Sequence, residues 1–157
     1  MAVQFAALTG ADVVAVGRSA EHLQVARELG ATRTINLSDP DMLANAAESV
    51  DAAVTFAPSD AVTAQALAIL KWGGTLVAGV PLSVEGLAFN KEQVIKTSIL
   101  GSREQMRTVL ELAATGKIRT VVDRFPMSQA TSALGLLAEG KLRSRAVLYN
   151  AEATSLD

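Results

Sequence analysis

Three consecutive residues, Gly17, Arg18 and Ser19, could bind a phosphate group at the end of a short apolar run. An arginine guanidinium carries a fixed positive charge and a fork of donors that matches phosphate oxygens. A serine that begins a helix adds a hydroxyl, a backbone N–H and the positive end of the helix dipole. The alternative is that Gly17 only permits a tight turn and that Arg18 is a solvated surface charge.

The same three positions bear on which dinucleotide the chain would prefer, if it binds one. A carboxylate at the end of the strand would accept hydrogen bonds from the adenosine ribose hydroxyls of NAD and would repel an added 2′-phosphate. Gly17 has neither effect, whereas Arg18 could pair with that phosphate. The sequence therefore favours NADP over NAD.

Two uncharged turns and one arginine are further candidate binding positions. Ala57 and Pro58 follow one apolar run, and Val80 and Pro81 follow another. Small apolar turns let backbone groups approach a flat ring, although each turn alone is more simply explained as a connection. Arg145 could clamp a pyrophosphate or could be a solvated charge near a helix end.

Residues for ordinary catalysis are scarce in this sequence. There is no cysteine, and the single histidine, His22, falls in the first turn of an expected helix. We expect His22 at the surface, with a ribose-edge contact as the alternative. A zinc site needs three or four nitrogen, sulfur or carboxylate ligands, so we expect neither zinc nor catalytic residues within this chain.

Composition excludes several classes of partner. The formal net charge of −2 and an aromatic content of 4% offer no basic or aromatic surface for nucleic acid or an anionic membrane. No apolar run approaches the roughly 18 residues of a membrane span, and the start lacks the pattern of a signal peptide. A cytoplasmic protein is the resulting expectation.

Apolar, β-branched runs alternate with segments of helical period, which predicts an α/β fold with a doubly wound parallel sheet. We expect strands at 12–16, 33–36, 52–56, 75–79, 97–100 and 145–149. Helices are expected at 1–8, 20–29 and 61–70, and apolar stripes that face a sheet begin at Met106 and Ala130. These elements predict one domain over residues 1–150 and a disordered tail over 151–157.

The chain begins one element later than this pattern requires. A helix at 1–8 that feeds a strand at 12–16 should itself follow a strand and a glycine-rich loop. Without that central strand, two inner edges would carry unpaired backbone groups. We expect the chain to pair those edges again, borrow a strand or adopt an altered strand order.

Six segments in order resemble the cofactor-binding, C-terminal half of the medium-chain zinc-type alcohol dehydrogenases and quinone reductases. They are residues 1–6, 28–31, 51–54, 73–81, 99–102 and 140–148. The resemblance covers residues 1 to about 150 and implies a Rossmann-like domain that binds NAD(P). The matching segments do not include the first strand, the glycine-rich loop or the amino-terminal catalytic domain of that family, and this domain holds most of the zinc ligands.

The resemblance also implies roles for the candidate residues. Gly17, Arg18 and Ser19 would meet the adenosine ribose or its phosphate, and Arg145 would hold the pyrophosphate. Adenine and its ribose would lie against two residues, Ala57 and Pro58, and the nicotinamide ribose and carboxamide against two others, Val80 and Pro81. A homodimer through edge strands near residues 87–100 and a separate catalytic domain are implied as partners.

The leading hypothesis is therefore the NAD(P)-binding portion of an oxidoreductase that transfers hydride as a whole enzyme and is not catalytic alone. The alternative is a non-catalytic dimerisation or regulatory module that retains the scaffold. A methyltransferase that uses S-adenosylmethionine shares the strand–helix alternation. It ranks low because its glycine loop and its acid after the second strand are missing.

Overall fold

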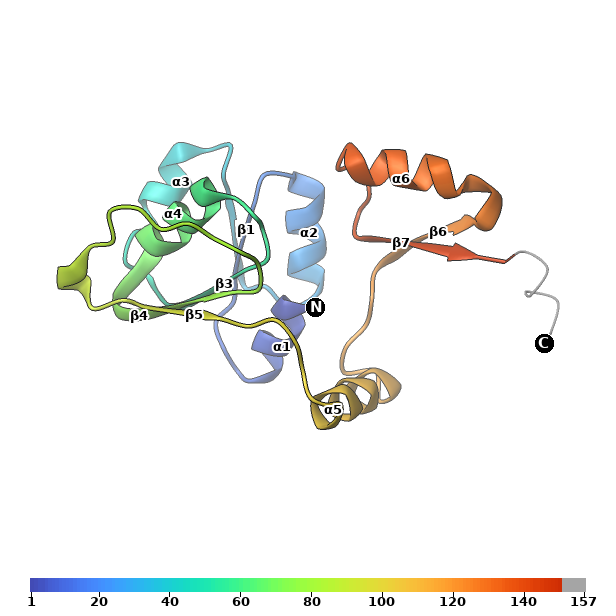
Figure 1. The fold of residues 1–157 in the computed structure, drawn as a ribbon, viewed down its shortest axis with the longest axis horizontal. Helices are drawn as coiled ribbons and strands as arrows, with labels where there is room; N and C mark the ends of the chain where they lie inside the picture. Colours follow the sequence, from blue (N-terminus) through green and yellow to red (C-terminus); the bar gives the residue numbers. More distant parts are fainter. Residues whose placement is uncertain (151–157) are drawn as a thin grey trace. The chain divides into compact units, whose positions relative to one another are not determined.

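A computed structural model describes residues 1–150, and the predicted tail at 151–157 lies outside the described residues. Helices and strands alternate along the chain (Figure 1), as the sequence predicts. The helices are α1 (Ala2–Leu8), α2 (Ala20–Glu28), α3 (Pro40–Ala44), α4 (Asp60–Ile69), α5 (Arg103–Ala114) and α6 (Ala130–Ala138). The strands are β1 (Val14–Gly17), β2 (Arg33–Asn36), β3 (Val50–Thr55), β4 (Leu70–Ala78), β5 (Val94–Thr97), β6 (Val122–Pro126) and β7 (Arg145–Tyr149). Two short 3₁₀ helices are η1 (Phe89–Lys91) and η2 (Met127–Gln129).

The chain forms two compact units. Apart from the first two residues, one consists of residues 3–34 together with residues 113–150, here called the terminal unit. The other is residues 35–112, called the central unit. The terminal unit contains α1, β1, α2, β6, α6 and β7, and the central unit contains α3, β3, α4, β4 and β5.

The described strands are divided among three sheets rather than one. Their orders are β1-β2, β3-β4-β5 and β6-β7. In the central unit β4 runs parallel to both neighbours, with Val77 opposite Val54 of β3 and Lys96 of β5. In the terminal unit β6 runs parallel to β7, with Phe125 opposite Leu148. The predicted α/β fold with parallel strands is confirmed, and β3 is left as an edge strand of its sheet.

Local signals explain the best-predicted helix, α2. Ser19 adopts extended backbone angles, and its Oγ accepts a hydrogen bond from the backbone N–H of His22 at 3.3 Å, as an N-cap residue does. The helix closes before Gly30, whose φ of 109° is strained for residues with a side chain. The predicted boundaries, Ala20 and Leu29, differ from the observed ones by one residue at the carboxyl end.

Helix α3 was not predicted because it is too short to show a helical period, and strand β6 was not predicted because charged residues interrupt its apolar pattern. Helix α3 has five residues, and Asp39 begins it by accepting hydrogen bonds from the N–H groups of Asp41 and Met42 at 3.0 and 3.4 Å. Strand β6 contains Asp123 and Arg124 among its five residues, which weakens its apolar pattern. Pairing with β7 supplies the structure that the local sequence does not specify.

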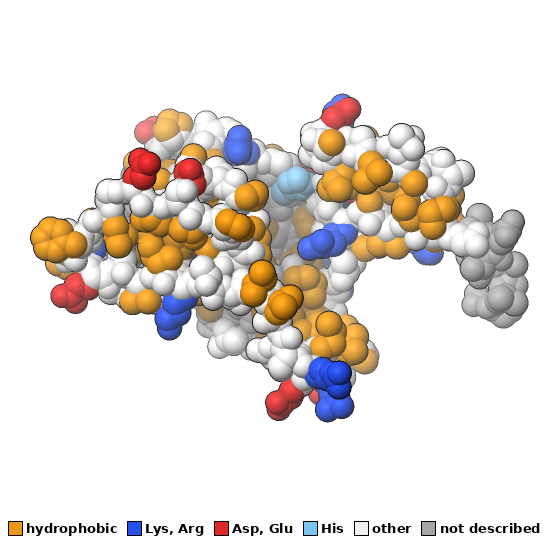
Figure 2. Space-filling view, viewed as in Figure 1, with side chains coloured by type: hydrophobic (Ala, Val, Ile, Leu, Met, Phe, Trp, Pro, Cys, Tyr) orange, Lys and Arg blue, Asp and Glu red, His pale blue; other side chains and the backbone are white. Residues whose placement is uncertain are grey.

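Two predictions about position were wrong. The strand expected at 97–100 lies at Val94–Thr97, and Ile99 and Leu100 after it are 91% and 88% exposed. The apolar stripe of α5 faces no sheet, because the helix has no buried residue and both Met106 and Leu110 are exposed. Figure 2 shows such hydrophobic side chains on the molecular surface. In both cases the sequence period identified an apolar segment but not what covers it.

Each unit has a small core. In the central unit it consists of Ile35 of β2, Thr55 of β3, Thr63 of α4, Ile69 and Leu70 at the α4–β4 junction, and Leu76 and Ala78 of β4. In the terminal unit it consists of Leu23, Ala31, Ile118, Ala133 and Leu142. No helix within residues 1–150 is long and apolar enough to cross a membrane.

Candidate functional site

The turn between β1 and α2 presents the three predicted phosphate-binding residues in sequence. Gly17 is the last residue of β1, Arg18 is exposed, and Ser19 begins α2. Within residues 1–150 the side chain of Arg18 forms no ion pair or hydrogen bond. Its guanidinium is therefore available to an external anion in the part of the chain that the structure describes.

The side chain of Ser19 already has a structural role. Its Oγ accepts from the His22 backbone N–H, but a hydroxyl has a proton of its own to donate. The first turn of α2 also contains Glu21, whose negative charge opposes an anion at this helix end. The cationic character of the turn therefore comes from Arg18 and the helix dipole alone.

Gly17 leaves room for a side chain at the end of β1. Its φ is not in the left-handed region, so other residues can adopt its backbone conformation. A Cβ built there would lie 3.4 Å from Cδ2 of Leu23, an ordinary van der Waals contact. The absence of a carboxylate at this position is thus a feature of the sequence and not a steric requirement of the fold.

His22 links this turn to a distant segment of the terminal unit. Its Nε2 lies 2.7 Å from the carbonyl oxygen of Leu142. Because a carbonyl only accepts, Nε2 carries the proton in this contact. The sequence predicts His22 at the surface, and its side chain does lie at an exposed position. Nothing in the sequence, however, signals a contact across 120 positions.

The segment that follows Leu142 contains two arginines with different environments. Arg143 donates from Nε and Nη2 to Oδ1 of Asp123 at 3.0 and 2.9 Å, and its backbone N–H donates to Oδ2 at 3.0 Å. The side-chain hydrogen bonds from Arg143 hold the pKa of Asp123 below its usual value. Arg145, the first residue of β7, is exposed and has no such partner within residues 1–150.

The two predicted apolar turns meet at one edge of the central sheet. β3 and β4 are parallel and Thr55 pairs with Ala78, so the turn at Ala57 and Pro58 and the turn at Val80 and Pro81 leave the same carboxyl edge. The Gly79 N–H donates to the Thr55 carbonyl at 2.9 Å. The structure therefore brings these four predicted residues together within the central unit.

Phe56 is a residue of this edge that sequence reasoning passed over. Its ring lies directly on Gly79, so that a Cβ built at Gly79 would overlap ring atoms Cδ1 and Cε1. The side chain is nevertheless 64% exposed. A large exposed aromatic residue beside two small apolar turns is the signal that could have identified it.

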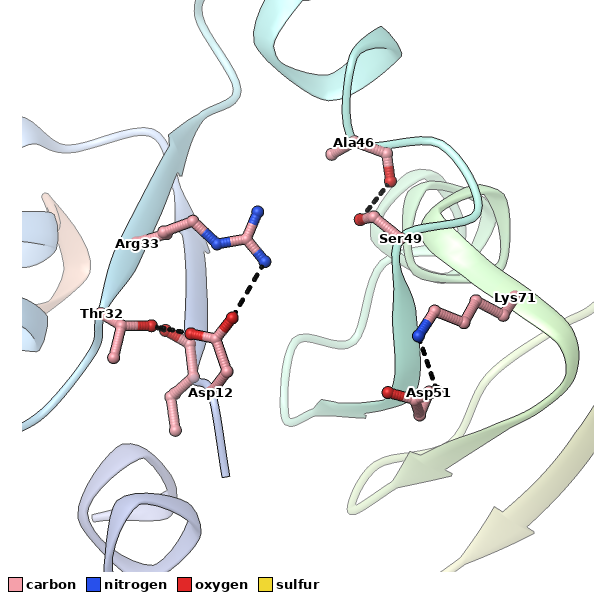
Figure 3. Close-up of polar contacts among 8 residues, drawn as sticks. Asp12, Thr32, Arg33, Ala46, Ser49, Asp51 and Lys71 are labelled. Carbon is pink, nitrogen blue, oxygen red and sulfur yellow. Dashed lines mark hydrogen bonds and ion pairs between the residues drawn. The ribbon is translucent and has the colours of Figure 1, made fainter. Parts of the chain in front are cut away.

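Carboxylates near the strand starts have structural partners (Figure 3). In the terminal unit Asp12 accepts from Thr32 and pairs with Arg33 at 3.4 Å. In the central unit Lys71 donates to Asp51 at 2.8 Å, which lowers the pKa of the Asp51 carboxyl. These groups lie near the amino ends of β1, β3 and β4, away from the candidate residues.

A cavity of about 380 Å³ in the terminal unit lies elsewhere, between the end of α1, the end of α2 and the segment Gly116–Arg119. None of the candidate residues lines it. Among residues 1–150 no three histidine or carboxylate side chains gather where they could hold a metal ion. Because the sequence also has no cysteine, the described residues do not fit a zinc site.

Comparison with known proteins assigns the family. The Zinc-binding dehydrogenase family matches residues 1–115. An alcohol dehydrogenase of Geobacillus stearothermophilus is 33% identical over 157 residues, which covers 94% of this chain and 46% of that protein. A NAD-dependent alcohol dehydrogenase of Sulfolobus acidocaldarius is 32% identical over 160 residues, with the same coverage of each.

Solved structures agree with this assignment. The alcohol dehydrogenase of Aeropyrum pernix superposes with a TM-score of 0.83 at 26% identity, covering 94% of this chain and 45% of that one. A zinc-binding dehydrogenase of Sinorhizobium meliloti, solved with NADP, gives a TM-score of 0.71 at 25% identity over 84% of this chain and 44% of that one.

The chain is thus an α/β domain with parallel strands. It belongs to the zinc-binding dehydrogenase family and corresponds to its cofactor-binding domain. It spans about half the length of the curated relatives it matches.

Proposed function

We propose that this chain binds a nicotinamide dinucleotide, with NADP preferred over NAD, as the cofactor-binding portion of an oxidoreductase that resembles alcohol dehydrogenases. When bound, the nicotinamide would supply or accept hydride. The chain's own residues would bind and orient the dinucleotide. The observation that carries this proposal is the β1–α2 turn, where Gly17 precedes an exposed arginine without a partner in residues 1–150.

The preference for NADP follows from charge at that turn. The 2′-phosphate of NADP adds negative charge on the adenosine ribose, and a guanidinium can pair with it through two hydrogen bonds. The hydroxyl of Ser19 could donate one more. With Gly17 in place of a carboxylate, nothing at the end of β1 repels the phosphate.

The other candidate residues would hold the rest of the dinucleotide. Arg145 would pair with the pyrophosphate, since its charge is not used by a described carboxylate. Ala57 and Pro58 would line adenine and its ribose. Val80 and Pro81 would contact the nicotinamide ribose and carboxamide, where small turns expose backbone donors and acceptors to the ligand.

We further propose that hydride transfer needs a separate catalytic domain, because the described residues offer no zinc site. The location we propose is cytoplasmic.

A non-catalytic dimerisation module is the second candidate function. It is favoured by β5, an edge strand of its sheet that is followed by exposed Ile99 and Leu100, which would form a homodimer near residues 87–100 by edge pairing.

Calorimetric titration of the purified chain with NADPH and NADH tests the first proposal. Saturable binding, tighter for NADPH, is the expected result. No heat of binding for either dinucleotide up to millimolar concentration would reject cofactor binding and leave the dimerisation module. Tighter binding of NADH would reject the preference alone.

A further inference from the structure

We infer that Phe56 is an aromatic contact for one of the two planar rings of the bound dinucleotide and so contributes to its affinity. The inference rests on the proposed function and names a contact which that proposal does not include. It is drawn from the central unit alone, where Phe56 stands between the two candidate turns.

The ring of Phe56 is held in place by its neighbour on β4. It lies against the backbone of Gly79, where there is no side chain to displace it. Gly79 is fixed in turn by its hydrogen bond to the Thr55 carbonyl. A ring positioned by backbone contacts loses little freedom when a ligand stacks on it, so its contribution to affinity is not offset by ordering.

The residues that follow Phe56 and Gly79 in the sequence are small or apolar and carry no charge, namely Ala57, Pro58, Val80 and Pro81. The nearby carboxylate of Asp60 accepts from the backbone N–H of Ser83 at 3.3 Å and would repel a phosphate. A neutral planar ring is therefore better suited to this edge than the charged parts of the dinucleotide.

The position of Phe56 distinguishes it from other exposed aromatic residues of the central unit. Trp72 lies near the start of β4. Phe89 belongs to η1, whose Lys91 pairs with Glu48, two residues before β3 begins. Both lie toward the amino ends of the strands, whereas ligands of open α/β sheets bind at the carboxyl ends. Phe89, which is 91% exposed, is thus a matched control.

The first test compares NADPH affinity by calorimetry in the wild-type chain, Phe56→Leu and Phe89→Leu. Leucine keeps an apolar contact with Gly79 but removes the aromatic face. We expect Phe56→Leu to weaken binding about tenfold, the loss typical of one stacked base, and Phe89→Leu to bind as wild type. Equal affinity in all three proteins overturns the inference while leaving the proposed function intact. No binding by the wild type rejects the proposed function, and the inference with it.

A second measurement needs no variant. In the wild-type chain with NADPH bound, nuclear Overhauser contacts are expected between Phe56 ring protons and protons of adenine or nicotinamide. Their absence in a saturated sample overturns the inference. Titrating 2′,5′-ADP and nicotinamide mononucleotide separately into wild type and Phe56→Leu identifies the ring: the weakened fragment contains it, and unchanged affinity for both fragments also overturns the inference.

Discussion

Gln4 and Arg119, which are 115 positions apart in the sequence, exchange two hydrogen bonds in the terminal unit. The Nε2 of Gln4 donates to the Arg119 carbonyl, and its Oε1 accepts from the Arg119 N–H, both at 2.9 Å. Gln4 is 7% exposed. A side-chain amide thus takes the place of a neighbouring strand for the backbone N–H and C=O of one residue, and it ties α1 to the segment before β6.

Replacing Gln4 by leucine should destabilise the chain. The substitution removes two hydrogen bonds, each of which contributes about 0.5–1.5 kcal/mol, so we expect the free energy of unfolding to fall by about 1–3 kcal/mol. Urea denaturation followed by circular dichroism measures it. The matched control is Gln24→Leu, because Gln24 is exposed and bonds only to Glu28 of its own helix. Equal losses in the two variants would contradict the structural role of Gln4.

A carboxylate at position 17 should reverse the coenzyme preference. Gly17→Asp would accept hydrogen bonds from the ribose of NADH and repel the 2′-phosphate of NADPH, and the fold tolerates a side chain there. We expect the ratio of NADPH to NADH affinity to fall about tenfold or more, since one charge-assisted hydrogen bond is worth about 1.5–3 kcal/mol. Calorimetric titration gives both constants.

Gly17→Ala is the control for this change, because it fills the same space without adding charge. It should leave the ratio close to that of the wild type. A ratio that falls equally in both variants would mean that bulk at the end of β1, and not charge, determines the preference.

Elements that depend on local interactions could be predicted from the sequence, and elements that depend on distant ones could not. α2 was predicted within one residue because its signals are local, namely the Ser19 cap and the stop at Gly30. β6 was missed because its pairing with β7 is made by residues more than twenty positions away. α5 was recognised by its period, but the sequence could not say that Met106 and Leu110 remain exposed.

In the candidate site too, some features could be predicted from the sequence and others depend on contacts between distant residues. Parallel pairing of β3 and β4 places Ala57 and Val80 at one edge, which follows from the strand order alone. The position of Phe56 on Gly79 depends on three-dimensional packing, as does the hydrogen bond from His22 to Leu142. No local pattern encodes those contacts.

Asp123 should make the stability of the chain depend on pH in the acid range. Arg143 lowers the pKa of Asp123 in the folded state, so the ion pair stabilises the fold above the unfolded-state pKa of about 3.9. That stability is lost as the pH falls through the lower, folded-state value. Asp123→Asn should therefore be less stable at pH 7 and lose less stability between pH 5 and pH 2.

Urea midpoints measured across this pH range test the prediction. Asp41→Asn is the control, since Asp41 forms no ion pair among residues 1–150. If Asp123→Asn retains the full acid sensitivity of the wild type, the pair with Arg143 does not contribute to it.

Gly30 should tolerate no side chain, for two separable reasons. Its φ of 109° strains any other residue, and a Cβ there would lie 2.9 Å from the Cβ of Ala7 on α1. We expect Gly30→Ala to lower the free energy of unfolding by about 2–4 kcal/mol, the sum of backbone strain and overpacking. Gly10→Ala, with a φ of 83° and no atom within 4 Å, isolates strain and should cost about 1 kcal/mol. In the Gly30→Ala variant, the additional change Ala7→Gly removes the clash. Ala7→Gly should therefore raise the free energy of unfolding more in this variant than in the wild type. If it recovers no more, the contact between α1 and Gly30 is not what makes glycine necessary.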